Sequence, residues 1–387
     1  MTLSTSVDKV ASAIERASSG LVNRRALVEL IVLSAIAGEH LLVIGPPGTA
    51  KSLAVRRISQ QFGGRYFEYL LGKFTEPSEL FGPVDLRRLK EGVFETRTEG
   101  MLPEAEIAFL DEVFRGSSAI LNTLLGILNE RSFRRGTTVQ RCPLRVCVGA
   151  SNELPEDEAL AAFADRFLVQ VYADAVEDRM LEELLEAGWR SDAQGPTLPA
   201  ASLADLDALA AAVTQVDMSG VLGPLADAIR TLRNLDLPLS DRRIVRAQRL
   251  VAASAVLAGR SLADGRDLWP FVYVVSGREE QARAREALRE HLAAAANPTL
   301  PYAAEDAAAG AAARAARLVA EASALLAQLD AADGADPRTL HLRLEALGRE
   351  IDAGFPPGEL PEDLAEMRAR LRSRVESYRS TAAASGA

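Results

Sequence analysis

An unbroken apolar run, Leu-Leu-Val-Ile at residues 41–44, closes on a Gly-Pro-Pro-Gly turn, and this feature constrains the fold of the chain most strongly. Apolar residues without alternation predict a strand buried on both faces, as in a parallel sheet. A helical pattern begins at Lys51, soon after the turn. Further apolar runs at 65–70, 107–110 and 144–148 predict more strands of the same sheet, with helices between them. Alternating strands and helices predict an α/β fold with a doubly wound parallel sheet.

The rest of the chain carries helical patterns. Residues 6–38 have apolar side chains at helical spacing, which predicts two amphipathic helices before the first strand. Beyond Val171 the strand signals fade, and short helices are predicted at 203–216, 222–235, 240–258 and 268–275. From about residue 280 the chain is rich in Ala, Arg and Glu, which predicts three long helices. We expect three domains: an α/β core at 1–195, an all-α lid domain at 196–279 and a C-terminal helical arm at 280–387.

Composition argues against some classes of function. The chain has 387 residues and a net charge of −10, which disfavours a broad nucleic-acid-binding face. The longest apolar neighbourhood, residues 27–44, is interrupted by Glu29 and Glu39, so we expect a cytoplasmic protein without a membrane span. Cys142 and Cys147 lie at an odd separation on one predicted strand, so their side chains face opposite ways. We expect two reduced core thiols there.

The octapeptide GPPGTAKS at residues 45–52 has nearly the pattern of a phosphate-binding loop. Lys51 offers an ammonium for phosphate oxygens, Ser52 a hydroxyl for Mg²⁺, and the following helix its positive dipole end. Ala50 stands where the pattern has a second glycine. Because Ala50 directly precedes the helix, we expect right-handed helical φ and ψ there, which any L-residue adopts. The predicted nucleotide-binding residues are Gly45, Pro46, Pro47, Gly48, Thr49, Ala50, Lys51, Ser52 and Leu53. By itself the loop is also compatible with a plain turn between a strand and a helix.

A second apolar run ends in adjacent carboxylates, Asp111 and Glu112. Adjacent carboxylates repel and are costly to bury unless a cation lies between them. We therefore expect Asp111, together with Ser52, to hold Mg²⁺, and Glu112 to polarise the attacking water as a general base. Acids in the first turn of a helix are the structural alternative. With the phosphate loop upstream, the two motifs favour ATP and Mg²⁺ as the bound groups.

Three more side chains complete the predicted site. Asn152 follows the strand at 144–148 and is placed to orient water or a γ-phosphate oxygen. Arg166 follows a short helix, and its guanidinium is a candidate for stabilising the transferring phosphoryl group in a neighbouring subunit. Arg242 begins a lid helix and is a candidate contact for the γ-phosphate, with Arg243 as the competing residue.

These residues resemble the AAA+ ATPases, and within them the MoxR group, in particular the RavA (regulatory ATPase variant A) type. The resemblance covers roughly residues 20–275 and rests on short motifs in order. They are GPPGTAKS, ELFGPVDL at 79–86, LPEA at 102–105 leading into FLDE, AILNTLL at 119–125, NER at 129–131 and ASNELPE at 150–156.

The resemblance implies a ring, usually hexameric, with ATP between subunits. It implies Walker A roles for Lys51 and Ser52, Walker B roles for Asp111 and Glu112, and sensor 1 for Asn152. It further implies a trans arginine finger at Arg166 and sensor 2 at Arg242. The segment 75–99 takes the place of an insertion that faces the ring's pore, which makes Phe81 or its neighbours candidates for client contact.

MoxR proteins commonly act as chaperone-like remodellers of protein clients, together with a protein that carries a von Willebrand factor A domain. The chain departs from the RavA type, because residues 290–387 have no strand-like run that could form its β-rich C-terminal insertion. The leading hypothesis is therefore an ATP-hydrolysing ring motor acting on protein clients. The alternatives are a nucleotide-gated scaffold with little turnover and a motor directed at nucleic acid, which the acidic balance disfavours.

Overall fold

A computed structural model describes residues 3–176, 178–191, 198–237, 239–308, 311–330, 337–355 and 360–385. Its central sheet has the strand order β2-β3-β6-β1-β7, and all neighbouring strands in it are parallel. These strands are β1 (Leu41–Ile44), β2 (Tyr66–Leu70), β3 (Ile107–Asp111), β6 (Val146–Ser151) and β7 (Val169–Tyr172). The predicted α/β fold with a parallel sheet is therefore confirmed.

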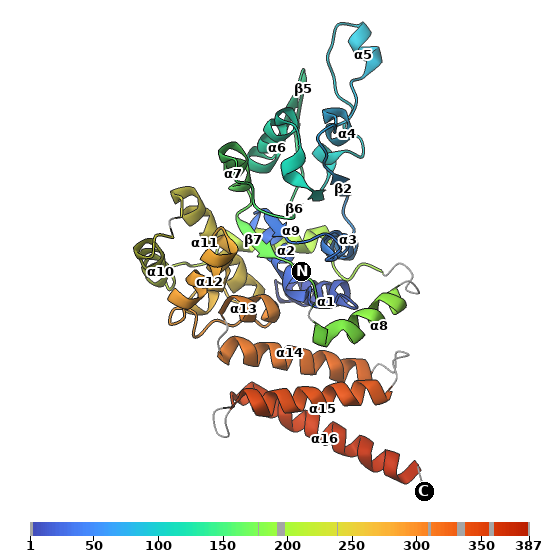
Figure 1. The fold of residues 1–387 in the computed structure, drawn as a ribbon, viewed down its shortest axis with the longest axis vertical. Coiled ribbons are helices and arrows are strands. Elements are labelled where there is room, and N and C mark those ends of the chain that lie inside the picture. Colours follow the sequence, from blue (N-terminus) through green and yellow to red (C-terminus); the bar gives the residue numbers. More distant parts are fainter. Residues whose placement is uncertain are drawn as a thin grey trace.

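Helices surround the sheet and form the rest of the chain (Figure 1). Those before the end of β7 are α1 (Leu3–Ser18), α2 (Arg25–Ala37), α3 (Lys51–Phe62), α4 (Pro77–Phe81), α5 (Leu86–Lys90), η1 (Leu102–Glu104), η2 (Val113–Arg115), α6 (Ser118–Glu130) and α7 (Glu158–Ala164). After β7 come η3 (Asp178–Met180), α8 (Leu181–Ser191), α9 (Leu203–Val213), α10 (Leu222–Asn234), α11 (Asp241–Leu257), η4 (Gly265–Asp267), η5 (Trp269–Val274), α12 (Arg278–Ala287), α13 (Pro301–Ala308), α14 (Ala311–Asp330), α15 (Pro337–Gly354) and α16 (Glu362–Ser385). No helix among the described residues is long and apolar enough to cross a membrane.

Helix α2 differs from its prediction as an amphipathic helix. Its residues from Leu27 to Ala37 are all buried, because α1, α9, α11 and α13 pack around it. The helix therefore lies inside the molecule and has no solvated face. Even Glu29 is fully buried, and burial raises the pKa of its carboxyl group to about 8.

A hairpin that sequence patterning does not predict projects from one end of the molecule (Figure 1). It consists of β4 (Ser132–Arg135) and β5 (Thr138–Arg141), and its backbone joins the α4–α5 segment through Thr137 N–H, which donates to the Phe94 carbonyl at 3.0 Å. Phe81 stacks on Phe133 of β4 and is fully buried. The expectation that Phe81 itself touches a client is therefore wrong, because its ring packs the base of this projection.

The two cysteines are buried, as expected, but not on one strand. Cys147 belongs to β6, whereas Cys142 directly follows β5. Burial raises the pKa of the Cys142 thiol to about 11 and that of Cys147 to about 12. Both groups are therefore protonated at neutral pH.

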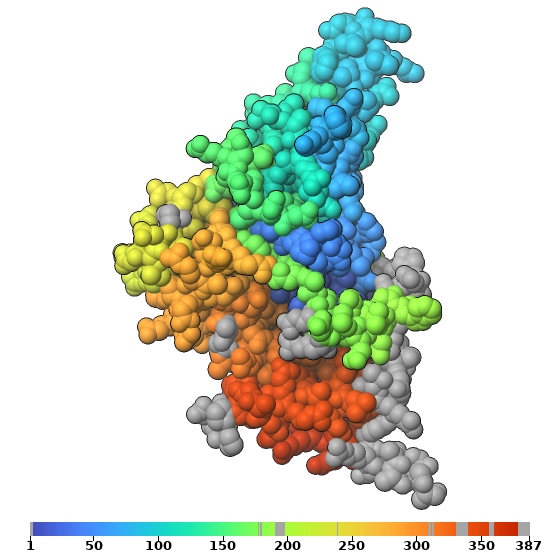
Figure 2. All heavy atoms as spheres, viewed as in Figure 1, coloured from blue at the N-terminus to red at the C-terminus, as the bar shows by residue number. Residues whose placement is uncertain are grey.

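The C-terminal segment divides between two hydrophobic clusters. Buried side chains of α12 and α13, and Ala313 at the start of α14, belong to the main cluster with α2 and α11, whereas the rest of α14 forms a second cluster with α15 and α16. In Figure 2 these last helices make a separate layer at the far end from the hairpin. We propose that the C-terminal arm begins at α14 instead of at residue 280.

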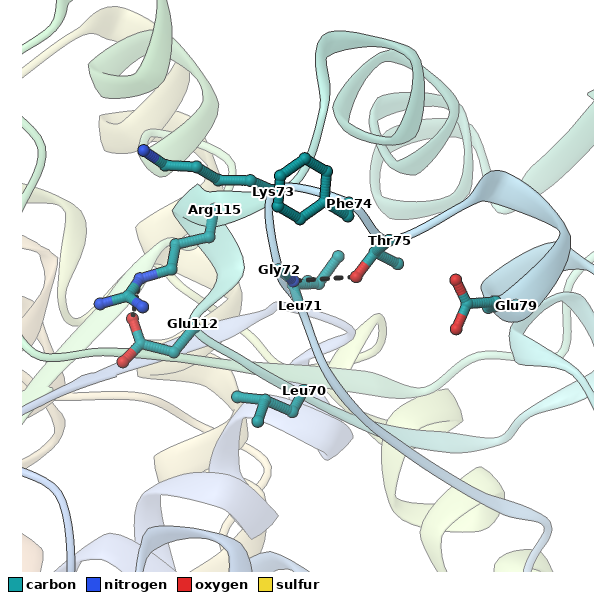
Figure 3. A pocket seen from close by; sticks show the side chains of 9 residues that line it. All are labelled: Leu70, Leu71, Gly72, Lys73, Phe74, Thr75, Glu79, Glu112 and Arg115. Carbon is teal, nitrogen blue, oxygen red and sulfur yellow. Dashed lines mark hydrogen bonds and ion pairs between the residues drawn. The ribbon is translucent and has the colours of Figure 1, made fainter.

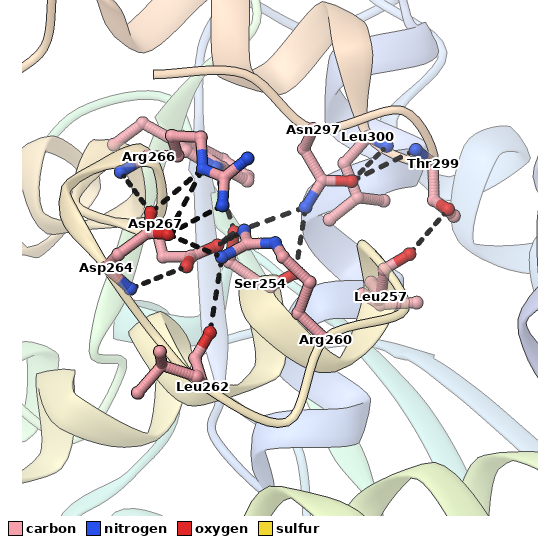
Figure 4. A network of polar contacts seen from close by, with 11 residues as sticks. Ser254, Leu257, Arg260, Leu262, Asp264, Arg266, Asp267, Asn297, Thr299 and Leu300 are labelled. Carbon is pink, nitrogen blue, oxygen red and sulfur yellow. Dashed lines mark hydrogen bonds and ion pairs between the residues drawn. The ribbon is translucent and has the colours of Figure 1, made fainter. Parts of the chain in front are cut away.

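A buried polar network holds the segment before α13 against α11 (Figure 4). Asn297 is fully buried, and its Nδ2 donates to the Ser254 carbonyl at 2.9 Å. Its Oδ1 accepts the backbone N–H groups of Thr299 and Leu300 at 3.0 Å each. The Ser254 hydroxyl donates to the buried carboxylate of Asp267 at 2.9 Å. Because these polar groups have partners, the chain enters α13 in one fixed position.

Candidate nucleotide site

The predicted site residues of β1, β3 and β6 meet at the carboxyl-terminal edge of the sheet. In the sheet β6 lies between β3 and β1, with Leu110 opposite Gly149 and Val43 opposite Ala150. The ends of these strands therefore lie side by side, and Lys51, which follows β1, faces the carboxylates that end β3. In an open α/β sheet, ligands usually bind just beyond the carboxyl ends of the strands.

Lys51, the two carboxylates and Asn152 lie in one neighbourhood of the structure, as one hydrogen bond and the electrostatics of Lys51 indicate. Asn152 Nδ2 donates to Glu112 Oε1 at 3.0 Å. Burial lowers the pKa of the Lys51 ammonium, and the charges of Asp111 and Glu112 act on it in the opposite direction. The sheet thus gathers an ammonium, two carboxylates and an amide at one edge.

The loop after β1 wraps around the Lys51 ammonium. Lys51 is 7% exposed, and its Nζ donates to the carbonyls of Gly45 and Pro46 at 2.8 Å each. Gly45 cannot carry a side chain, because a Cβ there would lie 2.2 Å from the Ala173 carbonyl oxygen. An ammonium has three N–H bonds, and these contacts use two of them. The donor set, with the N-terminus of the twelve-residue helix α3, therefore fits a polyphosphate.

Ala50 does not have the right-handed conformation that we expected. Its φ is 58° and its ψ is 26°, which is the left-handed region. The prediction was wrong because Ala50 is the N-cap of α3 and lies outside the helix, at the point where the loop reverses. An L-residue in this region carries a strain of roughly 1–2 kcal/mol, which glycine avoids.

Glu112 lies at the border of an open cavity of about 520 Å³ (Figure 3). Its backbone is also left-handed, with φ 50°, and Asp111 Oδ1 accepts the Glu112 N–H at 2.9 Å. Arg115 Nε lies 3.2 Å from Glu112 Oε2, whereas Asn152 donates to the other carboxylate oxygen, Oε1. Glu112 is therefore oriented from two sides. Sequence reasoning missed Arg115, although its i+3 position after the carboxylate is a usable signal.

The two predicted arginines, Arg166 and Arg242, lie at the amino-terminal ends of the strands, on the opposite side of the sheet from the phosphate loop. Arg166 precedes β7, whose first residue, Val169, lies opposite Leu41 at the start of β1. Its buried Nε has no hydrogen-bond partner among the described residues. Arg242 Nη2 donates to Asn129 Oδ1 at 2.6 Å, near the end of α6. The structure therefore does not bring Arg166 or Arg242 to the phosphate loop of the same chain.

Arg242 and Arg243 have different environments. The end of α6 beside Arg242 lies at the start of β1, because Arg131 Nη2 donates to the Gly38 carbonyl at 2.9 Å. Arg243 is 4% exposed, and its guanidinium donates to the carbonyls of Val274 and Leu168 and to the Asp165 carboxylate. Arg243 thus fastens α11 to the turn before β7. Its donors are already used, which makes Arg242 the better candidate for a nucleotide contact.

Sequence reasoning also missed Arg24, which lies just before α2. Its side chain is buried against the phosphate loop, and its Nε donates to the Thr49 carbonyl at 2.7 Å. No local motif marks this residue, since its partners depend on how α2 packs beside the loop.

The fold and the site define a class of protein. A parallel sheet with a GPPGTAKS loop, facing carboxylates and an asparagine directly after the intervening strand describes a P-loop ATPase of the AAA+ type. A solved structure of a candidate ATPase from Cytophaga hutchinsonii has a similar fold, with a TM-score of 0.61 and 18% identity, over 76% of this chain and 96% of that one.

Sequence comparison gives the family. Residues 8–211 match the model of the MoxR domain found in MoxR–vWA–beta-propeller ternary systems. An uncharacterised protein of Methanocaldococcus jannaschii is 37% identical over 255 residues, which are 66% of each chain. The chaperone MoxR1 of Mycobacterium tuberculosis is 27% identical over 184 residues, covering 46% of this chain and 48% of that protein. This chain belongs to the MoxR family of ATPases.

Proposed function

We propose that this protein is an ATP-hydrolysing motor that remodels or matures protein clients. The observation that carries the proposal is the meeting of Lys51, Asp111, Glu112 and Asn152 at one sheet edge, with Asn152 bonded to Glu112. A protein that only binds nucleotide needs the lysine, but it does not need an oriented carboxylate beside it. Turnover benefits from one, because a positioned base that accepts the water's proton accelerates the reaction of ATP and water to ADP and phosphate by about 10²–10⁴-fold.

Each residue has a step in this reaction. Lys51 exchanges the carbonyls of Gly45 and Pro46 for phosphate oxygens. Ser52 and Asp111 would hold Mg²⁺, which when bound screens the negative charge of the phosphates. Glu112, oriented by the Asn152 amide, accepts the proton of the attacking water.

The arginines support a ring in which sites are completed by a neighbour. Arg166 and Arg242 lie at the sheet edge opposite Lys51, so neither reaches the phosphates of its own chain without a large rearrangement. In a closed ring, one surface of each subunit contacts a different surface of the next subunit. We propose a hexamer in which Arg166 acts as the trans arginine finger and Arg242 as sensor 2 from the adjacent subunit.

The client surface that we propose is the projection formed by α5 and the β4–β5 hairpin, named the tip here (residues 85–97 and 132–141). Its exposed large apolar side chains are Leu86 (70%), Leu89 (45%), Phe94 (39%) and Val139 (71%). An exposed patch of apolar side chains is a common mark of a protein interaction site. A partner with a von Willebrand factor A domain is proposed from the description of the matching family. The RavA type remains a proposal, and the described C-terminal residues contain no strand.

Phosphate release by wild type and Glu112→Gln tests the proposal. We expect the Glu112→Gln variant to retain nucleotide binding and to lose at least about 100-fold in turnover, because an amide cannot take the proton. Equal rates would contradict the motor and favour the nucleotide-gated scaffold. Mixing Arg166→Ala subunits into wild-type rings should lower turnover more than in proportion to the mutant fraction; a proportional decline would contradict action in trans.

A second assay addresses the client. Leu86→Ser with Leu89→Ser should abolish any stimulation of turnover by client protein while leaving basal turnover intact, since both residues lie far from Glu112. Leu222→Ser is the matched control, because Leu222 is 50% exposed on α10, outside the tip. Stimulation of wild type by DNA or RNA would instead favour a nucleic-acid motor.

A further inference from the structure

Arg24 is a buried cation beside the turn that ends the phosphate loop. It is 5% exposed, and its guanidinium donates only to backbone carbonyls. Nε donates to Thr49 at 2.7 Å, Nη1 to Asn23 at 2.6 Å, and Nη2 to Asp174. Two of these carbonyls belong to segments that leave the carboxyl edge of the sheet, after β1 and after β7. One planar group therefore ties the phosphate loop to the loop after β7.

The orientation of the Thr49 carbonyl is coupled to the strained backbone conformation of Ala50. Thr49 and Ala50 share a peptide plane, and in a trans peptide the carbonyl and the N–H point in opposite directions. When Arg24 holds the Thr49 oxygen, the Ala50 N–H is turned away from Arg24, to the other side of the loop. The left-handed φ of 58° at Ala50 accompanies this orientation. Without Arg24, an alanine would relax toward its preferred right-handed region.

The charge of Arg24 also acts on the site. Burial lowers the pKa of the Arg24 guanidinium, and the charge of the nearby Asp174 carboxylate, which bonds to Arg278 at 2.6 and 2.9 Å, raises it. Burial lowers the pKa of the Lys51 ammonium, the charges of Asp111 and Glu112 raise it, and the charge of Arg24 lowers it further. Two buried or partly buried cations beside one loop repel each other, and a polyphosphate relieves that repulsion.

We propose that Arg24 is a positioning residue of the phosphate loop: it holds the strained Thr49–Ala50 peptide in its nucleotide-binding orientation and adds a second positive charge to the anion site. The inference rests on the proposed function, because it assumes that the loop binds a nucleoside polyphosphate. It adds a residue outside the GPPGTAKS loop to the nucleotide-binding machinery.

A double-mutant cycle with ADP and Mg²⁺ as the probe tests the inference. Calorimetric titration would compare Arg24→Gln, Ala50→Gly and the double variant with wild type. We expect Arg24→Gln to weaken ADP binding about 10-fold or more, and the loss to be about 5-fold smaller in the Ala50→Gly background. A glycine at position 50 has no strain to release, so its loop keeps the binding shape better when Arg24 is absent.

Two further variants separate positioning from stability. Arg24→Lys keeps the charge but cannot hold the Thr49 and Asp174 carbonyls with one rigid fork, so its affinity should lie between those of wild type and Arg24→Gln. This variant also serves if Arg24→Gln does not fold. Arg260→Gln removes a partly buried guanidinium in the network of Figure 4, away from the loop, and should lower thermal stability without changing ADP affinity.

The outcomes are distinct. Equal losses from Arg24→Gln with alanine and with glycine at position 50 would overturn action through the strained peptide. Unchanged ADP affinity with lowered thermal stability would show a merely structural residue and overturn the inference as well. Absence of ADP binding by folded wild type would overturn the nucleotide proposal itself, and the inference with it.

Discussion

Replacing Ala50 by glycine gives a direct measure of the strain in the phosphate loop. Ala50 has φ 58° and ψ 26°, a conformation that costs an L-residue roughly 1–2 kcal/mol. Glycine removes that strain, but it also adds backbone freedom to the unfolded chain. This added entropy lowers the free energy of unfolding by about 0.5–1 kcal/mol. We therefore expect Ala50→Gly to raise the free energy of unfolding by roughly 0–1.5 kcal/mol, or up to about tenfold in the unfolding equilibrium.

The matched control is the same substitution at a right-handed position. Ala208 lies in the interior of α9 and is exposed, so its methyl group contributes helix propensity and little packing. Ala208→Gly should lower the free energy of unfolding by about 1 kcal/mol. The two variants therefore have opposite signs, although they make the same chemical change.

Urea unfolding followed by circular dichroism gives both values, provided that the slopes of the transitions agree among the variants. The comparison is made without nucleotide, so that binding does not add to the stability. A lower urea midpoint for Ala50→Gly, equal to that of Ala208→Gly, would mean that residue 50 is right-handed in solution. Such a result would refute the left-handed turn at Ala50.

Other perturbations follow from buried groups. Asn297→Ala should lower the free energy of unfolding by about 2–4 kcal/mol in urea titration, because it leaves the backbone N–H groups of Thr299 and Leu300 without their acceptor. Glu29 has a folded pKa of about 8, raised by burial above its ordinary value, so the folded state holds its proton more tightly than the unfolded state. Stability should fall by about 1.4 kcal/mol per pH unit as the pH rises from about 5 to 8, and Glu29→Gln should flatten this dependence of the urea midpoint. Cys142 and Cys147 should react with a thiol reagent at pH 7.5 only after denaturation, because both thiols are buried and their pKa values are raised. Rapid labelling of the native protein would contradict this.

The strands of the parallel sheet could be predicted because burial on both faces leaves an unbroken apolar run. The run at 41–44 is fully buried in the structure, and its predicted ends agree with those of β1. The hairpin formed by β4 and β5 could not be predicted this way. Its sequence, from Ser132 to Arg141, is mostly polar and charged, since the hairpin projects into solvent and packs through Phe133 alone among its apolar residues.

The candidate site divides in the same way. Loop and strand-end residues such as Lys51 and Glu112 follow from local motifs, because a parallel sheet brings strand ends to one edge. Arg242 and Arg243 cannot be told apart by motif, since neighbouring residues of a helix point about 100° apart and only packing decides which one is buried. The contacts of Arg24 cannot be predicted from the local sequence, because its partner carbonyl at Asp174 lies 150 residues away.

Helix α2 connects the phosphate loop to the C-terminal segment, which bears on where the chain can be shortened. Just before α2, Arg24 holds the loop; in its first turn, Arg25 lies over the Tyr302 ring at 4.6 Å. One turn further, Glu29 accepts the Ala303 N–H at 2.8 Å, at the start of α13. A chain ending at residue 310 keeps these contacts and should bind ADP like the full chain. A chain ending at residue 296 lacks α13, which packs against α2. The ADP affinity of this truncated chain should fall, even when circular dichroism shows that it is folded. Equal affinities of the two truncations would mean that the loop does not depend on α13.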